Sequence, residues 1–322
     1  MVRDEAADAL PFRASRLSQH PGELCLAVDI GGTKLAAALV DRQGTLVWRD
    51  RIRTPRATDA NALFRVLADL VAIALLQADM RGPIVTCGVG CGGPMGPGGE
   101  QVSPLNIPAW RDFPLKASLV GYLGDAGQSE LRALRIDNDA KALALGEGWL
   151  GAARGVENFI GMVVSTGVGG GIVLDGRLLD GAAGNAGHIG HVIVEPEGRI
   201  CGCGARGCLE AEASGTGIEA ATGAPAEQAS PAVVERTGRL VGRAIGSVAN
   251  LLDLELAVVA GSVALGYGTS FFLAAQREVH AVARLQFSRA CRVEPAALGE
   301  TAPLIGAAAL GWRQLERLEA GS

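Results

Sequence analysis

The sequence predicts an α/β protein with two related lobes. Short apolar segments rich in β-branched residues alternate with longer segments whose apolar residues recur at helical spacing, which is typical of α/β architectures. A pattern of strand, glycine-rich turn, strand and turn also occurs twice, in residues 24–53 and 158–183. A chain of 322 residues is long enough for two domains with substantial cores.

The elements follow in order along the chain. The first copy of the repeat predicts strands over residues 24–30, 35–41 and 45–53, and the second predicts strands over 158–165, 172–175 and 177–183. Helices are expected over residues 61–80, 140–153, 231–253 and 303–320, and further strands over 84–91, 131–136 and 254–260. The uncharged run over 257–276 contains three glycines, so we interpret it as a strand, a turn and a helix start rather than a membrane span.

The domain organisation follows from this order. Residues 1–22 mix acids, arginines and prolines without the apolar core of a signal peptide, and we interpret them as a flexible tail. A smaller N-terminal α/β domain is expected from residues 23–134 plus 302–322. A larger α/β domain with a cysteine-rich loop is expected from residues 135–301.

The bulk composition excludes several classes of function. Net charge is −5 and the pI is about 5.5, so there is no basic field to hold nucleic acid, and aromatic residues reach only 4%. Seven cysteines without a secretion signal argue against a disulfide scaffold and favour the cytoplasm. We therefore expect a small-molecule ligand, with no nucleic acid and no membrane as partner.

The turn of the first copy has residues suited to bind phosphate. Gly31 and Gly32 allow the backbone to approach a ligand closely, so that N–H groups face anionic oxygens. Thr33 adds a hydroxyl donor and Lys34 a cation. Asp29 could hold Mg²⁺ through water, since Mg²⁺ prefers few carboxylates together with phosphate oxygens. The alternative is an ordinary hairpin with an acidic residue at its rim.

The second copy is expected to place its turn at residues 166–171. This segment has four glycines, among them Gly167 and Gly169, and hydroxyl side chains at Ser165 and Thr166. It is neither a Walker loop nor a Rossmann fingerprint, because a strand follows it. Two facing glycine turns, one in each lobe, would form a better phosphate cradle than either alone.

A third group of polar residues lies where a strand meets a helix. Asp139 follows Asn138 there, and its carboxylate could cap the helix or act as a general base toward an attacking hydroxyl. Asp137 competes for the same role and points to the opposite side of the segment. Asn106, in a proline-rich loop, offers both a donor and an acceptor, which suits a vicinal diol.

The segment from 184 to 210 predicts a metal site. Cys201, Cys203 and Cys208 fall within eight positions, and His191 lies ten residues before the first of them. Three thiolates and one imidazole complete a tetrahedral shell for Zn²⁺ and leave no position for a reacting water, so the ion would be structural. The alternative is three unpaired or disulfide-bonded cysteines. Glu210 lies two residues after Cys208. Its carboxylate could accept hydrogen bonds from two hydroxyl groups, or it could be an ordinary surface glutamate.

Together these motifs resemble the ROK family of bacterial sugar kinases and repressors, within the actin-like ATPase superfamily. The resemblance covers nearly everything from residue 24 to 309. Its most specific part is GNAGHIGH with CGCGARGCLE, beside DIGGTK, STGVGGG and NLLDLELAVVAGS. It implies a ribonuclease H-like fold whose two domains close on a sugar, with ATP and Mg²⁺ in the cleft between them. A homodimer is a further expectation from the family.

The resemblance also implies roles for individual residues. Asp139 would take the proton from the sugar 6-hydroxyl, and Gly261 would lie under the adenine or the ribose. Asn106, Asn138, Glu210 and His191 would contact the sugar, with His191 using its other ring nitrogen for zinc. Loss of zinc would then loosen the sugar loop, raise the sugar KM and leave ATP binding largely intact.

Two departures from the family pattern bear on these roles. His188 stands where the family usually has a glutamate that accepts hydrogen bonds near the anomeric end of the sugar, and a neutral histidine accepts at only one nitrogen. The identity of the sugar is therefore open. Lys141 is a cation two residues beyond Asp139 and is expected to help keep Asp139 ionised.

The functions that remain are a glucokinase, which is our first expectation, and an N-acetylhexosamine kinase acting on N-acetylmannosamine or N-acetylglucosamine. A sugar-sensing transcription regulator is the rival from another class. Only 28 residues precede Asp29, which is short for a DNA-binding domain, so a kinase is preferred.

Overall fold

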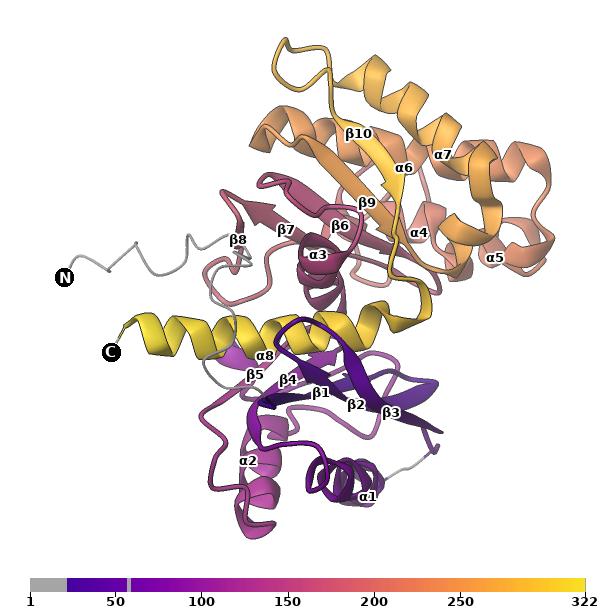
Figure 1. The fold of residues 1–322 in the computed structure, drawn as a ribbon. Coiled ribbons are helices and arrows are strands. Elements are labelled where there is room, and N and C mark those ends of the chain that lie inside the picture. Colours follow the sequence, from indigo (N-terminus) through magenta and orange to yellow (C-terminus); the bar gives the residue numbers. More distant parts are fainter. Residues whose placement is uncertain (1–21, 57–58, 322) are drawn as a thin grey trace. The chain divides into compact units, whose positions relative to one another are not determined.

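The fold is that of a computed structural model, drawn in Figure 1, which describes residues 22–56 and 59–321. The expected tail lies outside the described residues, apart from Gly22. The chain divides into two compact units. The first runs as far as Leu150 and also contains Asp180–Ala186 and the residues from Glu300 onward, and the second contains Gly151–Leu179 and Gly187–Gly299.

The helices and strands alternate as the sequence predicts. The strands are β1 (Leu24–Ile30), β2 (Lys34–Asp41), β3 (Leu46–Arg53), β4 (Ile84–Cys91), β5 (Ala133–Asn138), β6 (Phe159–Val164), β7 (Val168–Leu174), β8 (Arg177–Leu178), β9 (Leu256–Ala260) and β10 (Arg292–Pro295). The α-helices are α1 (Ala60–Ala78), α2 (Leu115–Asp125), α3 (Asp139–Leu150), α4 (Leu209–Ala213), α5 (Gly215–Thr222), α6 (Pro231–Leu252), α7 (Ser262–Val282) and α8 (Ala302–Ala320). Short 3₁₀ helices are η1 (Pro97–Gly99), η2 (Ile189–His191), η3 (Ala226–Gln228) and η4 (Gly299–Thr301).

The two sheets have the same strand order, which confirms the repeat. The first sheet is ordered β3-β2-β1-β4-β5, and the second, taken from its other end, is ordered β8-β7-β6-β9-β10. In each unit an antiparallel meander of three strands lies beside parallel strands. Parallel neighbours require long connections, and helices provide them.

The sheet of the first unit is covered on both faces (Figure 1). Helices α1 and α2 lie on one face, where Leu63, Leu67 and Leu119 join the apolar core. Helix α8 lies on the other face, and the buried Thr86 hydroxyl of β4 donates to the Gly311 carbonyl of α8 at 2.8 Å. Among the described helices, α1 is long and apolar enough to span a membrane by length and composition, but its apolar stripe packs against this sheet.

The second unit has its own core. Helices α6 and α7 pack against each other and against β6 and β9, with Leu240, Ile245 and Phe271 fully buried. The uncharged run over residues 257–276 forms β9, a turn at Gly261 and the start of α7, as the sequence predicts. The glycine breakers thus separate a strand from a helix within the core of this unit.

Two boundaries differ from those expected. Strand β5 pairs with β4 through parallel hydrogen bonds, so residues 135–150 belong to the first unit and not to the C-terminal one, and the C-terminal unit is the smaller of the two rather than the larger. The second glycine turn is also shorter than expected, because β7 already begins at Val168 and Gly169 pairs with Val163 of β6. Glycines within a strand were mistaken for turn residues, since composition alone does not reveal which glycines join the hydrogen-bond ladder.

Candidate functional site

The first glycine turn joins β1 to β2 at residues 31–33. The Gly31 N–H donates to the Lys34 carbonyl at 3.0 Å. Thr54 braces the turn from the end of β3: its hydroxyl donates to the Gly31 carbonyl at 2.7 Å and its N–H donates to the Thr33 carbonyl at 3.0 Å. The Gly32 and Thr33 residues are exposed. The turn is thus held from behind by its own sheet, with its outer side open to a ligand.

The loop that carries Asn106 lies against this turn. A Cβ atom added to Gly32 would come within 2.6 Å of the Asn106 Cβ, so only glycine allows this approach. Asn106 is exposed, whereas Trp110 is fully buried and stacks on Phe113 at 4.7 Å between ring centroids. Trp110 is therefore a core residue, and Asn106 is the polar residue that the loop presents beside the turn.

Asp29 and Asp139 approach each other at the carboxyl ends of β1 and β5. The pKa of Asp29 is raised from 3.8 to about 7, chiefly by burial and also by the Asp139 carboxylate, while Lys34 opposes the shift. Asp29 is only 7% exposed, whereas Asp139 is exposed. Burial and the same two carboxylates also raise the pKa of the Cys91 thiol, which ends β4 between them. This corner concentrates negative charge that a cation would relieve.

Asp137 is neutralised by cations of its own unit. It is buried and accepts from Arg135 at 2.8 Å and from Lys141 at 3.1 Å. Asp180 completes the network, at 3.0 Å from Arg135 and 2.8 Å from Lys141. Although burial disfavours the charge of Asp180, these two cations lower its pKa. Asp137 is therefore unsuited to act as a base, which favours Asp139 for that role.

Lys141 is buried and pairs with two carboxylates of its own unit. Its side chain is 1% exposed, and its ammonium group contacts Asp137, Asp180 and the Gly184 carbonyl, the last at 3.0 Å. These contacts join it to two carboxylates and a backbone carbonyl, and the support expected for Asp139 stays a prediction. Lys141 ties the segment 180–186 to α3.

Asn138 and Asp139 both contact the first turn of α3. Asn138 Oδ1 accepts from the Ala140 N–H at 3.0 Å, and Asp139 Oδ1 accepts from the same group at 2.8 Å. The Asn138 contact has the spacing of an N-cap, whereas Asp139 contacts only the N–H of the next residue, so both roles considered for Asp139 stay predictions. The Asp139 carboxylate lies at the start of a helix, where a negative charge is stabilised by the helix dipole.

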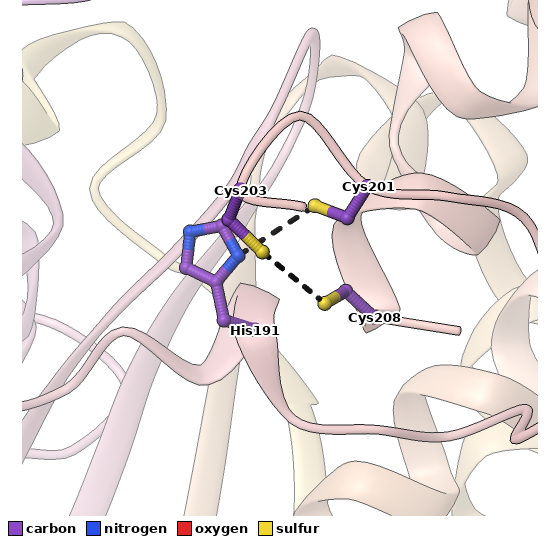
Figure 2. Close-up of side chains that lie close together, drawn as sticks. All are labelled: His191, Cys201, Cys203 and Cys208. Carbon is purple, nitrogen blue, oxygen red and sulfur yellow. Dashed lines mark hydrogen bonds between the residues drawn. The ribbon is translucent and has the colours of Figure 1, made fainter. Parts of the chain in front are cut away.

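The four predicted metal ligands converge within the second unit. Figure 2 shows the His191 ring and the three thiols pointing toward one another. Their ligand atoms all lie within 4.8 Å of one another, with His191 Nδ1 at 3.7 Å from Cys201 Sγ and Cys203 Sγ at 3.7 Å from Cys208 Sγ. Thiolates around one zinc ion at about 2.3 Å would stand roughly 3.8 Å apart, whereas a disulfide requires about 2.05 Å. The donor set and spacing fit Zn²⁺ and exclude disulfides among these cysteines.

The second glycine turn is held by the segment that follows the metal ligands. Within the turn, the Ser165 N–H donates to the Gly167 carbonyl at 2.9 Å. Glu210, in the first turn of α4, accepts from the Val168 N–H through Oε2 at 2.9 Å. Gly167 makes room for this carboxylate, because a Cβ atom there would come within 2.8 Å of Oε2. Thr216 reaches the same turn: its hydroxyl donates to the Thr166 carbonyl at 2.9 Å.

His188 and His191 flank η2, which packs against β7. Their ring centroids are 6.2 Å apart with near-parallel planes, and both residues are exposed. His191 directs Nδ1 toward Cys201, which leaves Nε2 for another partner. His188 therefore lies next to His191 but is not one of the four clustered ligand residues.

Gly261 lies next to the second glycine turn. It follows β9, the parallel neighbour of β6, as the N-cap residue of α7, and has φ of +101°, which only glycine adopts readily. Ser262, the first residue of α7, shares a hydrogen bond of 2.9 Å with the Ser165 hydroxyl. The first residue of α7 therefore meets this turn, and α7 is interrupted six residues later, at Gly268, where φ is +60°.

Sequence reasoning missed Glu212, which supports the loop that carries the predicted metal ligands, residues 191–208, here called the metal loop. Glu212 is 2% exposed and accepts from the Arg199 N–H at 2.6 Å and from the Arg236 guanidinium at 2.6 Å. Burial disfavours its charge, but these bonds lower its pKa. Thr54 and Thr216 were missed as well. No sequence signal marks them, because each acts on a turn at least 20 residues away.

Comparisons with known proteins agree with this geometry. The ROK family model matches residues 25–314. The N-acetylmannosamine kinase of Haemophilus influenzae is 35% identical over 299 residues, covering 88% of this chain and 94% of that protein. The ROK hexokinase from Thermus thermophilus is 32% identical with a TM-score of 0.76, covering 91% of this chain and 99% of that one. A ROK family glucokinase from Streptomyces griseus, solved with glucose and AMPPNP, is 28% identical with a TM-score of 0.72, covering 90% and 99%.

The repeated sheets, the paired turns and these matches define the protein as a sugar kinase with the two-domain actin-like ATPase fold. The chain belongs to the ROK family.

Proposed function

We propose that the protein transfers a phosphoryl group from ATP to the 6-hydroxyl of an N-acetylhexosamine, and of N-acetylmannosamine before others. The similarity to N-acetylmannosamine kinases at 35% identity favours this substrate over the glucose that we expected first. His188 supports the change, because it replaces the glutamate that the family places near the anomeric end of the sugar. Glucose is the second candidate, since a relative of known structure holds it.

The observation that carries the proposed chemistry is the pairing of exposed Asp139 with buried Asp29 beside the first glycine turn. Asp139 would accept the proton of the attacking hydroxyl, since a general base must be ionised and accessible. Asp29 would hold Mg²⁺ through water. The bound Mg²⁺ would neutralise charge on the phosphate oxygens.

The remaining assignments divide between the units. In the first unit, Gly31, Gly32, Thr33 and Lys34 would bind phosphate, and Asn106 and Asn138 would bind sugar hydroxyls. In the second unit, Thr166, Gly167 and Gly261 would bind the nucleotide, whereas Glu210, His188 and His191 would bind the sugar. Gly169 no longer fits a nucleotide role well, because its N–H and carbonyl lie within the β7 ladder.

The metal cluster would hold a structural Zn²⁺ through His191, Cys201, Cys203 and Cys208. With four protein ligands there is no open position for chemistry, so its role would be to fix the loop. Metal analysis of the purified protein tests this: one zinc per chain is expected, and Cys203→Ser should lower that content.

A coupled assay on a sugar panel tests the proposed function. Glucose, mannose, fructose, N-acetylglucosamine and N-acetylmannosamine would each be compared by kcat/KM with ATP as donor. We expect the highest value for N-acetylmannosamine. If glucose gave the highest value, the glucokinase assignment would be favoured instead. If none of the five sugars were phosphorylated, the kinase proposal would be overturned. His188→Glu should shift preference toward glucose.

The homodimer and the cytoplasmic location expected from the sequence remain predictions. Light scattering on the purified protein measures the oligomeric state.

A further inference from the structure

A short segment joins the metal loop to the second glycine turn. Residues 210–216, which we call the brace, make three kinds of contact with that turn. Glu210 accepts from the Val168 N–H at 2.9 Å. The Gly215 N–H donates to the Ser165 carbonyl at 2.7 Å. Thr216 donates to the Thr166 carbonyl through its hydroxyl at 2.9 Å and through its N–H at 3.3 Å. Both ends of the turn are therefore held from one side by the brace.

The brace is in turn fixed to the metal ligands. Cys208 is the N-cap residue of α4, so the first residue of the brace lies two positions beyond a ligand. The Leu209 N–H donates to the Val192 carbonyl at 2.9 Å, next to His191. Glu212, within the brace, accepts from the Arg199 N–H at 2.6 Å. A shift of the metal loop would therefore move α4, and with it Glu210.

The two carboxylate oxygens of Glu210 have different surroundings. Oε2 accepts from the Val168 N–H, whereas no hydrogen bond among the described residues reaches Oε1. One side chain can therefore hold the turn through one oxygen while the other oxygen accepts from a ligand hydroxyl. Hydrogen bonds to a carboxylate are among the stronger ones in proteins, so this contact is able to fix the turn.

We infer that Glu210 and Thr216 are positioning residues through which the metal-held loop sets the affinity of the second glycine turn for nucleotide phosphates. This inference rests on the proposed nucleotide site at that turn. It replaces the expectation that loss of zinc leaves ATP binding largely intact. Ser262, just after β9, contacts the turn at the Ser165 hydroxyl, but within the described residues the bonds to the Thr166 carbonyl and from the Val168 N–H are made with the brace, so the geometry of this part of the turn depends on the brace.

The first test removes one hydroxyl from the brace. Thr216→Val keeps the side-chain shape and the backbone contact, and it should raise the dissociation constant of Mg·AMPPNP three- to tenfold, measured by calorimetry without sugar. Thr216→Ser should restore the wild-type value. Thr222→Val is the matched control, because the Thr222 hydroxyl donates to the Ile218 carbonyl at 2.9 Å in the same helix, away from the turn. Equal affinities of Thr216→Val and wild type would overturn the inference.

The second test separates a coupling between the metal loop and the second glycine turn from a general loss of folded structure. Removal of the metal with a chelator should weaken Mg·AMPPNP binding by wild type about tenfold, while circular dichroism shows that the fold is kept. In Glu210→Ala the affinity should already be reduced, and metal removal should then change it less than twofold, because effects acting through one contact are not additive. Full additivity, or unchanged nucleotide affinity after metal removal, would refute the coupling.

These outcomes differ from those that test the proposed function. If the wild-type protein bound Mg·AMPPNP but phosphorylated no sugar of the panel, the proposed activity would be overturned. The effect of the brace on the Mg·AMPPNP dissociation constant could still be measured. A wild-type protein that binds no nucleotide would overturn both.

Discussion

The two glycine turns occupy equivalent places in the repeat but are stabilised in different ways. The first joins β1 to β2 and is braced by Thr54 at the end of β3, within the same sheet. The second joins β6 to β7 and is braced by Glu210 and Thr216, which follow the metal loop. The first turn lies beside the buried carboxyl group of Asp29 and the exposed one of Asp139, whereas the carboxylate at the second turn is that of Glu210. The same strand order therefore carries two differently supported turns: the first is held by its own sheet, and the second is held by the segment that follows the His191–Cys208 cluster.

The largest effect is expected from the carboxylate that only the first turn has beside it. Asp139→Asn should lower kcat by at least about 100-fold with little change in sugar KM, because a general base contributes about 10² to 10⁴ in rate. Steady-state kinetics with the preferred sugar measure both constants. Glu210→Gln is the contrasting variant from the second turn and should affect KM more than kcat. A nearly wild-type kcat for Asp139→Asn would remove Asp139 as the base.

A second prediction concerns the stability of the first turn at different pH. The folded-state pKa of Asp29, about 7, lies above its ordinary value of 3.8, so the unfolded chain loses the proton first as pH rises. Protonated Asp29 therefore contributes fully to the free energy of unfolding below about pH 4, and this contribution is lost as the pH rises from about 4 to about 7. Asp29→Asn should remove this loss and stabilise the metal- and nucleotide-free protein at pH 8 by up to about 4 kcal/mol, while abolishing activity.

Urea unfolding between pH 4 and pH 8 measures this difference. Asp137→Asn is the control, because Asp137 lies two strands away, in register with Asp29 through Gly90 of β4, but is paired with Arg135 and Lys141. Breaking a buried pair leaves cations uncompensated, so this variant should be destabilised. If Asp29→Asn were less stable than wild type at pH 8, the electrostatic strain assigned to Asp29 would be wrong.

The smallest effect tests whether the first turn is independent of the metal. Thr54→Val removes the hydroxyl that donates to the Gly31 carbonyl and should weaken Mg·AMPPNP binding about two- to tenfold, the range of one hydrogen bond. Chelation should weaken this variant by the same factor as wild type, since separate contacts add. A smaller effect of chelation on Thr54→Val would show that both turns respond to the metal, and the contrast between them would disappear.

Much of the fold and of the site was predictable from local patterns. The repeat, the two turns and the cysteine cluster depend on spacing within short segments, and the structure brings Asp29, Asp139 and Lys34 together as neighbours. The errors have a common origin. Gly169 was assigned to a turn because the run of glycines suggested it, whereas strand pairing placed it in β7. The strand β5 was assigned to the wrong domain for the same reason, since its pairing with β4 is a long-range contact.

The sequence by itself determined which chemical groups are present and which of them lie close along the chain: the glycines of the turns, the four metal ligands and the carboxylates at strand ends. Only the tertiary structure decided which of these groups touch across long separations, as Glu210 does with Val168, 42 residues away. The physical reason is that hydrogen bonds and ion pairs act over a few ångströms in space, and a folded chain places distant residues within that range.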